Sequence, residues 1–431
     1  YTESRVAVNN SFKALWMNLL GGAAFAAAII IMGLTYHSTA LSHLVGLALA
    51  GMPVTVILAL LLLCGFTKSA MMPFSGWLLG AMVAPTPTSA LLHSSTMVKA
   101  GVFLIIKLCP ALGNNHAGTM AMFVGGITFF FASCAAISQS DGKKVLAYST
   151  ISNLGLIVCC AGIGSYEAAW TAIMIVIFHA VAKSLLFLSV GTAEQQLGSR
   201  DIERFDGLFN AMPHLCLCMV IGISGMFLAP FGMLISKWAA MKAFIDAGHP
   251  MLLLLLVFGS ATTIFYWAKW LGKIMSIMNG QERREQGIVK EEWFTLKTLS
   301  WMTIIVCILF PLISNYGVLP YLRITYGFTR DVIAQSNLII MSLIVVLLVI
   351  LPSRYGKGQP KRKVGALLAG VNMGDDRNYH GAGDNIIPVE LRNWYMEEWF
   401  GERKMKLSGF ALCMACIFIQ FAIILGGVYR G

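Results

Sequence analysis

Three lysines lie inside stretches of the sequence that are otherwise apolar, namely Lys68, Lys183 and Lys237. Each has a proline, a histidine or small polar residues close to it along the chain. An ammonium group near the middle of a bilayer costs between about 2.5 and about 17 kcal/mol, so such residues usually face a protein or water interior. Their placement therefore indicates the movement of ions through a membrane.

Lys68 precedes Pro73 by five residues in LLLLCGFTKSAMMPFSGWLLGAM. Proline removes a backbone donor and collides with the carbonyl four residues before it, which predicts a helix that kinks or breaks beside the lysine. Broken backbone is tolerated at membrane depth only where it is buried in protein or lines water. The alternative is a lysine that extends from a helix end toward the headgroups, but Lys68 lies well inside a long apolar run.

A histidine and a lysine flank a row of hydroxyl groups in PTPTSALLHSSTMVKAGVFLIIK. On a helix His93 and Lys99 lie about 120° apart, and Thr96 is three residues from each and can border both. Hydroxyl groups between two titratable side chains are what a proton path needs. The alternative is that a neighbouring helix satisfies His93 and that the hydroxyls donate to carbonyls one turn back.

His179 and Lys183 are four residues apart in WTAIMIVIFHAVAKSLLFLSVG. A helix places such a pair on one face, with about 5–6 Å between the Cβ atoms. Two basic groups this close cannot both carry a charge cheaply in a dry interior. A single histidine would be interpreted as a core residue, whereas the pair predicts a functional site.

A second proline and lysine repeat the first pattern, because Pro230 precedes Lys237 in GMFLAPFGMLISKWAAMKAF. Pro73 and Pro230 are 157 residues apart (230 − 73). Matching interrupted helices in two parts of a chain are typical of transporters built from inverted repeats, with sites near the middle of the bilayer. Helix breaks are therefore predicted at Pro73 and Pro230, in equivalent positions of two repeats.

The composition predicts a membrane protein, since 57% of the 431 residues are apolar and only 12% are charged. The mean hydropathy is +0.74, and soluble domains do not have such a composition. A helix of about 20 residues crosses the hydrocarbon core. We predict an all-α polytopic membrane protein with about eleven spans, near residues 12–33, 52–82, 89–109, 117–138, 145–163, 169–193, 210–246, 251–278, 298–316, 336–352 and 408–428.

The loops predict the orientation, because lysine and arginine concentrate on the cytoplasmic side. With residue 1 in the cytoplasm, nearly all loop lysines and arginines lie on the cytoplasmic side, and the exceptions are Arg323, Arg330 and Arg430. The net charge of +11 then reflects topology and attraction to anionic lipid, with no nucleic-acid partner. We expect a multi-pass protein of a prokaryotic inner (plasma) membrane. The opening residues lack a signal peptide's apolar core, so further helices are expected upstream of Tyr1.

The sequence carries no motif for catalysis, and its two possible metal motifs fail on inspection. Cys413 and Cys416 have the spacing of a metal or redox pair but lie in an apolar run without a second pair or a histidine nearby. In DDRNYHGAGDN a calcium loop would need oxygen ligands or glycine where Arg377, Tyr379 and His380 stand. We therefore expect no metal, no cofactor and no catalytic centre within this chain.

Three stretches follow one another along the chain: PFSGWLLGAMVAPTPTSALLHSSTMVKAG, DGKKVLAYSTISNLG and FHAVAKSLLFLSVG. Together they resemble the antiporter-like membrane subunits shared by respiratory complex I, Mrp-type cation/proton antiporters and energy-converting membrane-bound nickel–iron hydrogenases. The resemblance implies two inverted five-helix repeats and a glutamate partner for Lys68, which we expect upstream because Glu3 lies outside any predicted span. It also implies that the ion-translocating residues are Lys68, His93, Lys99, His179, Lys183 and Lys237.

Within that group, HSSTMVKAG and APFGMLISKW resemble the antiporter-like subunit of energy-converting hydrogenases and the large Mrp subunit more than quinone-linked complex I. The stretch RNWYMEEWFGERKMKLSGF resembles the large antiporter-like subunit of an energy-converting (Ech-type) hydrogenase. This resemblance implies a redox-driven proton pump, with the other membrane and hydrophilic subunits of a ferredoxin-linked hydrogenase as partners. The alternatives are a subunit of a stand-alone Mrp-type Na⁺/H⁺ antiporter or of a complex I-type NADH:quinone oxidoreductase. A purely structural membrane anchor is disfavoured by the number of intramembrane bases.

The expected organisation has five parts. Residues 1–110 hold the last three helices of the first repeat, and 111–250 hold most of the second. Residues 251–352 form closing helices with a cytoplasmic loop at 279–297. A basic, amphipathic surface segment at 353–407 precedes a final transmembrane helix at 408–431.

Overall fold

The computed structural model describes residues 4–227, 232–276, 284–328, 332–333, 335–355, 368, 370–374, 378–389 and 392–428. Within these residues the protein is helical apart from one small sheet, and eight helices are long and apolar enough to cross a membrane. A ninth span is counted if two helices joined by a 64° bend are taken together. The prediction of an all-α polytopic membrane protein is confirmed.

The helices follow one another along the chain in three groups. The first group comprises α1 (Arg5–Tyr36), α2 (Leu41–Leu49), α3 (Thr55–Lys68), α4 (Gly76–Gly80), η1 (Ala81–Val83), α5 (Thr86–Ser94) and α6 (Met97–Leu112). The second comprises α7 (His116–Ile137), α8 (Gly142–Ile163), α9 (Tyr166–Leu197), η2 (Ile202–Phe205), α10 (Leu208–Ala211), α11 (Pro213–Phe227), α12 (Gly232–Asp246) and α13 (Pro250–Ile274). The third comprises η3 (Glu285–Gly287), α14 (Lys290–Ile308), α15 (Phe310–Leu312), the π-helical η4 (Ile313–Val318), α16 (Leu319–Tyr326), α17 (Gln335–Tyr355), α18 (Glu397–Phe400) and α19 (Glu402–Val428).

Three of the predicted spans are interrupted. The segment predicted at 52–82 consists of the 14-residue α3, a loop and the five-residue α4. The segment near 89–109 is divided between α5 and α6, and the segment near 298–316 bends by 64° after α14. Hydropathy counts apolar residues whether or not the helix through them is continuous, so the runs near 52–82 and 298–316 are predicted as single spans although neither holds one unbroken helix of spanning length.

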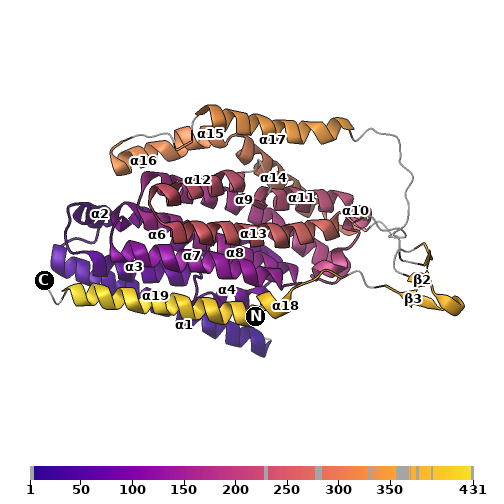
Figure 1. The fold of residues 1–431 in the computed structure, drawn as a ribbon, viewed down its shortest axis with the longest axis horizontal. Coiled ribbons are helices and arrows are strands. Elements are labelled where there is room, and N and C mark those ends of the chain that lie inside the picture. Colours follow the sequence, from indigo (N-terminus) through magenta and orange to yellow (C-terminus); the bar gives the residue numbers. More distant parts are fainter. Residues whose placement is uncertain are drawn as a thin grey trace.

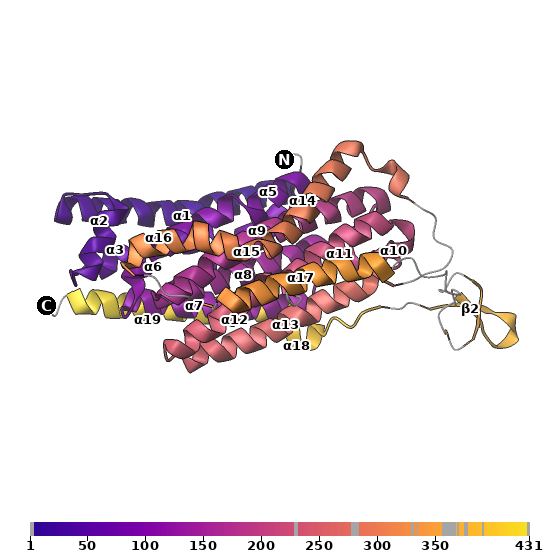
Figure 2. The same ribbon diagram turned by 90° about the horizontal axis from the view of Figure 1, so that it is seen from above.

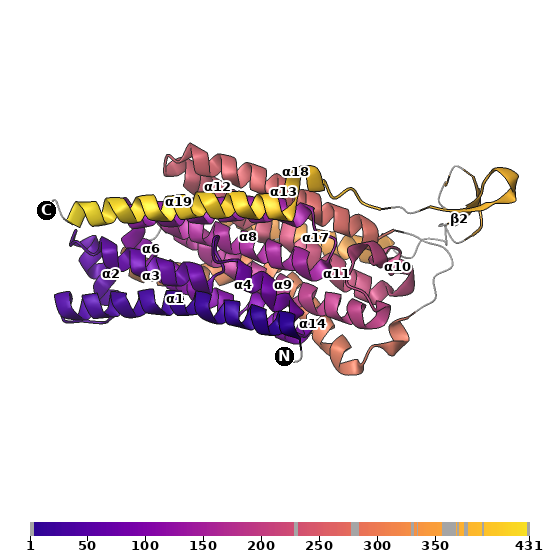
Figure 3. The same cartoon turned by 90° about the horizontal axis from the view of Figure 1, so that it is seen from below.

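The long helices lie side by side in an elongated bundle (Figure 1) with α8 at its centre. In α8, 94% of the most hydrophobic stretch is buried, compared with 28% in α1 and 22% in α19, which lie at the periphery. Figure 3 shows α19, last in the sequence, running across the side of the bundle that α1 also occupies. It packs along α7, where Cys413 Sγ lies 3.8 Å from Thr128 Oγ1.

The centre of the bundle requires a close approach of α7 and α8. Gly125 on α7 faces Gly155 on α8, and a Cβ atom built on Gly125 would lie 2.6 Å from the carbonyl oxygen of Gly155. At the start of α8, Asp141 accepts hydrogen bonds from the backbone N–H groups of Lys143 and Lys144 and caps the helix. The two glycines and the cap hold α8 in register against its neighbours.

A small sheet lies beyond one end of the bundle (Figure 2). Its strands are β1 (Val371–Asn372), β2 (Asn378–His380) and β3 (Ile386–Pro388), and β2 pairs antiparallel with both neighbours. The short η5 (Ala382–Asp384) connects β2 to β3. The sheet lies within the segment predicted as a surface region at 353–407, and it was not predicted from the sequence.

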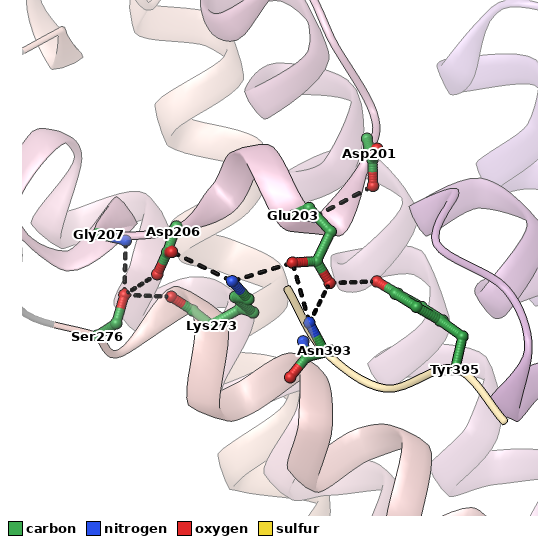
Figure 4. Close-up of polar contacts among 8 residues, drawn as sticks. All are labelled: Asp201, Glu203, Asp206, Gly207, Lys273, Ser276, Asn393 and Tyr395. Atoms are coloured by element: carbon green, nitrogen blue, oxygen red, sulfur yellow. Dashed lines mark hydrogen bonds and ion pairs between the residues drawn. The ribbon is translucent and has the colours of Figure 1, made fainter. Parts of the chain in front are cut away.

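An ion-pair cluster joins residues 392–396 to the bundle (Figure 4). Lys273, at the end of α13, places its Nζ 3.0 Å from Glu203 Oε2 and 3.1 Å from Asp206 Oδ2. The Tyr395 hydroxyl donates to Glu203 Oε1 at 2.5 Å, and the backbone N–H of Asn393 donates to the same carboxylate at 3.3 Å. Burial alone would raise the pKa of Glu203, but the hydrogen bonds from Tyr395 and Lys273 and the charge of Lys273 lower it.

Candidate functional site

Lys68 is the last residue of α3, and Pro73 lies in the loop between α3 and α4. The indole N–H of Trp77 donates to the carbonyl of Thr67 at 2.9 Å, so a backbone acceptor released at the helix end has a partner. Lys68 is half-buried, and in the part of the chain that the structure describes no carboxylate lies within ion-pair distance of it. The break therefore places a lysine at a helix end that is enclosed by protein.

The break between α5 and α6 falls at Ser95–Thr96, with hydroxyl residues on both sides. The hydroxyl groups of Ser94 and Thr96 both donate to backbone carbonyls of α5. Ser69 Oγ, just after α3, donates to the carbonyl of Val98 at 3.1 Å and joins this break to the one beside Lys68. The hydroxyls between His93 and Lys99 are thus used to stabilise broken backbone, and they form no direct bridge between the two bases.

Lys99 and His179 meet across α6 and α9. Lys99 Nζ lies 3.1 Å from His179 Nδ1, and both side chains are buried. At this distance one partner must donate and the other must accept, so either the imidazole is neutral and accepts from the ammonium, or the amine is neutral and accepts from the ring N–H. The geometry is that of two bases joined by one hydrogen bond.

Lys183 lies one turn after His179 on α9 and is completely buried. Its Nζ donates to Ser149 Oγ at 2.7 Å and to the carbonyl of Leu146 at 3.2 Å, both on α8, and lies 4.9 Å from the centre of the Trp267 ring on α13. His179 therefore contacts α6, while Lys183 contacts α8 and α13. The pair links α9 to three other helices.

His93 is buried on α5 with its ring centre 5.4 Å from that of Phe187 on α9. Among the described residues, neither ring nitrogen of His93 has a hydrogen-bond partner, and the same holds for Nε2 of His179. Buried polar atoms without partners are uncommon and are often found at functional sites. Both imidazoles therefore have ring nitrogens without a hydrogen-bond partner among the described residues.

Lys237 is buried in α12, and its Nζ lies 5.8 Å from the centre of the Phe129 ring on α7. Pro230, where the second helix break is predicted, lies outside the described residues; α11 ends at Phe227 and α12 begins at Gly232. Within the described ranges, no hydrogen bond joins Lys237 or Lys68 to the other predicted relay residues. Direct contact thus unites Lys99 with His179 and leaves the two outer lysines apart.

A cavity of about 660 Å³ lies between α6, α9 and the π-helical η4 and reaches Lys99. Its walls are apolar except for Lys99, Lys107, Tyr321 and two hydroxyl residues at the α5–α6 break. Sequence reasoning missed this cavity because the three elements that line it are far apart along the chain. A search of the described residues finds no cluster of three or more histidine, cysteine or acidic side chains that could hold a metal ion.

Comparison with known proteins places the chain in a family. Residues 1–263 match the family described as NADH:quinone oxidoreductase/Mrp antiporter, transmembrane. The chain belongs to this family. The predicted resemblance to antiporter-like membrane subunits is confirmed by this match and by the relatives below.

Individual relatives of the NADH:quinone oxidoreductase/Mrp family are longer than this chain. It is 32% identical over 311 residues to the Na(+)/H(+) antiporter subunit A1 of Staphylococcus aureus, a match covering 66% of this chain and 39% of that protein. It is similar to a chain of the Mrp complex from Dietzia sp., with a TM-score of 0.69 and 28% identity over 83% of this chain and 41% of the other. A chain of an archaeal membrane-bound sulfane sulfur reductase matches with a TM-score of 0.65 and 22% identity, covering 80% and 69%, which shows a shared fold.

Two contacts of the site in this family member were not predicted from the sequence. Ser149 accepts a hydrogen bond from Lys183, and Trp267 places its ring against the same ammonium. The signal for Ser149 is the polar run YSTISNLG inside an otherwise apolar span, since hydroxyls in a fully buried helix need partners. Trp267 carries no comparable signal, because an aromatic residue in a span is ordinary.

Proposed function

We propose that the chain translocates protons through buried lysines and histidines at mid-membrane, in the order Lys68, His93 or Lys99, His179, Lys183 and Lys237. The observation that carries the proposal is the 3.1 Å contact between Lys99 Nζ and His179 Nδ1, which brings bases on two helices within proton-transfer distance. The proton passes along α9 from His179 to Lys183, four residues on.

Electrostatic coupling passes a change of charge from one base to the next. A unit charge about 10 Å away contributes about 1.7 kcal/mol at an effective dielectric constant of 20, enough to shift the protonation of the next base. Gain or loss of a proton at one base thereby changes the protonation of the neighbouring bases, and this change propagates laterally through the bundle. The interrupted backbone at α3–α4 and α5–α6 lies beside the first bases of the series.

The repeat organisation is part of the same proposal. Residues 1–110 form the end of one antiporter repeat and 111–250 most of the other, so that Lys68 and Lys237 hold equivalent positions. Residues 251–352 close the bundle, 353–407 form a surface segment, and 408–431 supply the last transmembrane helix. The position of Lys68 at the end of α3 supports this arrangement.

The proposed setting is a multi-subunit redox-driven pump in a prokaryotic inner membrane, in which electron transfer in a ferredoxin-linked hydrogenase module drives the relay. A second candidate is a subunit of a stand-alone Na⁺/H⁺ antiporter, favoured by the 32% identity to subunit A1 of the Staphylococcus aureus antiporter. The two candidates share the relay and differ in what drives it.

Substitution of Lys183 tests the relay. Because Lys183→Ala and the longer Lys183→Met both remove the titratable group, each should abolish proton uptake by vesicles that contain the assembled complex, while electron transfer stays measurable in an uncoupled state. The matched control is Lys297→Met, since Lys297 is exposed and its Nζ lies 5.7 Å from the centre of the Trp293 ring. Wild-type proton uptake by an assembled Lys183→Met complex would contradict the relay.

Purification in mild detergent separates the two candidates. Hydrogenase subunits that co-purify with the chain, together with proton uptake that depends on a ferredoxin reductant, support the redox-driven pump. Na⁺/H⁺ exchange by the purified complex without any redox substrate supports the antiporter.

A further inference from the structure

The cavity beside Lys99 has the size and the chemistry of a binding site. Its volume of about 660 Å³ falls in the range of about 300–1,000 Å³ that is typical of small-molecule pockets. Two lysines of α6, Lys99 and Lys107, line the cavity. They are eight residues apart and therefore separated by about 12 Å along the helix axis. The wall between them is aliphatic and includes Val102, Ile106, Val176, Ile177 and Val318.

Lys107 is the charged group at the outer level of the cavity. Its Nζ lies 4.5 Å from the centre of the Tyr321 ring, and α6 ends five residues later at Leu112, so the ammonium lies close to a membrane–water interface. No carboxylate forms an ion pair with Lys107 or Lys99 within the described ranges. The ring face leaves ammonium N–H groups of Lys107 free to bind an anion.

The walls of the cavity decide what kind of anion fits. Lined mainly by aliphatic side chains, the cavity favours hydrocarbon over water. A free phosphate ion would leave these walls uncovered, and a neutral lipid would leave the positive charge of Lys107 unmatched. A molecule with one negative headgroup and a hydrocarbon chain matches both features.

We propose that an anionic phospholipid occupies this cavity, with its phosphate on Lys107 and an acyl chain extending between α6, α9 and η4 toward Lys99. The bound chain covers the side of Lys99 that faces the cavity and keeps water from it. Lipid occupancy therefore controls access to the base that contacts His179. Binding of the lipid itself does not depend on whether the chain translocates protons.

Native mass spectrometry of the assembled complex, released from nanodiscs containing phosphatidylglycerol and phosphatidylcholine, tests the proposal. The wild-type protein should retain phosphatidylglycerol in preference to phosphatidylcholine. Lys107→Gln should weaken that retention about fivefold, the effect of one lysine near an anionic headgroup. The matched control is Lys297→Gln, which removes a lysine that also lies over an aromatic ring but is remote from the cavity.

A second variant tests the acyl-chain part of the site without changing any charge. Gly317 lines the cavity, and a Cβ atom added to it meets no atom within 4 Å, so Gly317→Leu fills space without a clash. This variant should also lose phosphatidylglycerol. Gly272→Leu, in equally open surroundings on α13, is the matched control and should retain it.

Three results would overturn the proposal. The first is equal retention of phosphatidylcholine and phosphatidylglycerol by the wild-type protein. The second is unchanged lipid retention in both Lys107→Gln and Gly317→Leu. The third is a side chain or helix of a partner subunit occupying the cavity in a cryo-electron-microscopy map of the assembled complex.

Discussion

Replacement of Lys99 by arginine separates a proton relay from a role for fixed positive charge. Arginine keeps the charge and the hydrogen-bond donors of Lys99, but its guanidinium group stays protonated in proteins. A relay needs a group at this position that both gains and loses a proton. A structural or purely electrostatic role needs only the charge.

The size of the effect follows from the distance between Lys99 Nζ and His179 Nδ1, which is 3.1 Å. Two unit charges at that separation repel by about 5 kcal/mol at an effective dielectric constant of 20. Since 1.36 kcal/mol corresponds to a factor of ten, a permanent charge at position 99 disfavours protonation of His179 by about ten-thousandfold. Lys99→Arg should therefore stop proton transfer through His179, and Lys99→Met should stop it by removing the donor.

Proton uptake by vesicles containing the assembled complex, followed with a pH-sensitive dye, measures this effect. Both variants should show uptake at least a hundredfold below wild type, and Lys297→Arg should equal wild type because Lys297 is exposed and lies over the Trp293 ring instead of contacting the pair. Assembly is checked by size-exclusion chromatography. Wild-type uptake by an assembled Lys99→Arg complex would refute the exchange of a proton between Lys99 and His179.

Two further predictions concern stability and are measured by thermal unfolding of the detergent-solubilised protein. The pKa of the Glu203 carboxyl is lower in the folded state than in the unfolded state. The ionised carboxylate therefore stabilises the fold fully at pH values above the unfolded pKa, and this stabilisation is lost as pH falls through the folded pKa, below 4.5. Glu203→Gln should lower the free energy of unfolding by about 2 kcal/mol at pH 7, because it weakens the contact with Lys273. The difference between variant and wild type should shrink as pH is lowered. A difference in stability that does not change with pH would contradict this linkage. Gly125→Ala should destabilise by about 1–3 kcal/mol, because the added Cβ atom collides with backbone of α8 at Gly155, whereas Gly22→Ala, in open surroundings, should not; equal unfolding temperatures would show that α7 and α8 separate without cost.

The two interrupted helices differ in whether their breaks could be predicted from the sequence. Pro73 predicts a break beside Lys68, and in the structure α3 ends at Lys68. The break at Ser95–Thr96 has no proline at its centre and depends on hydroxyls that donate to the backbone and on a hydrogen bond from Ser69 to α6. A local breaker can be recognised in a sequence, but a break held open by a neighbouring helix cannot.

The sequence alone determined that this protein is an all-α membrane protein of the antiporter family with lysines and histidines inside its spans, because hydropathy, charge and motifs are properties of consecutive residues. Only the tertiary structure decided which of those bases meet. Lys99 and His179 are separated by 80 residues, and Lys183 and Ser149 by 34. The physical reason is that a helix buried on nearly every side, such as α8, has no exposed polar face that would show which side packs against which neighbour. The choice of partners therefore depends on close packing, such as the contact of Gly125 with Gly155.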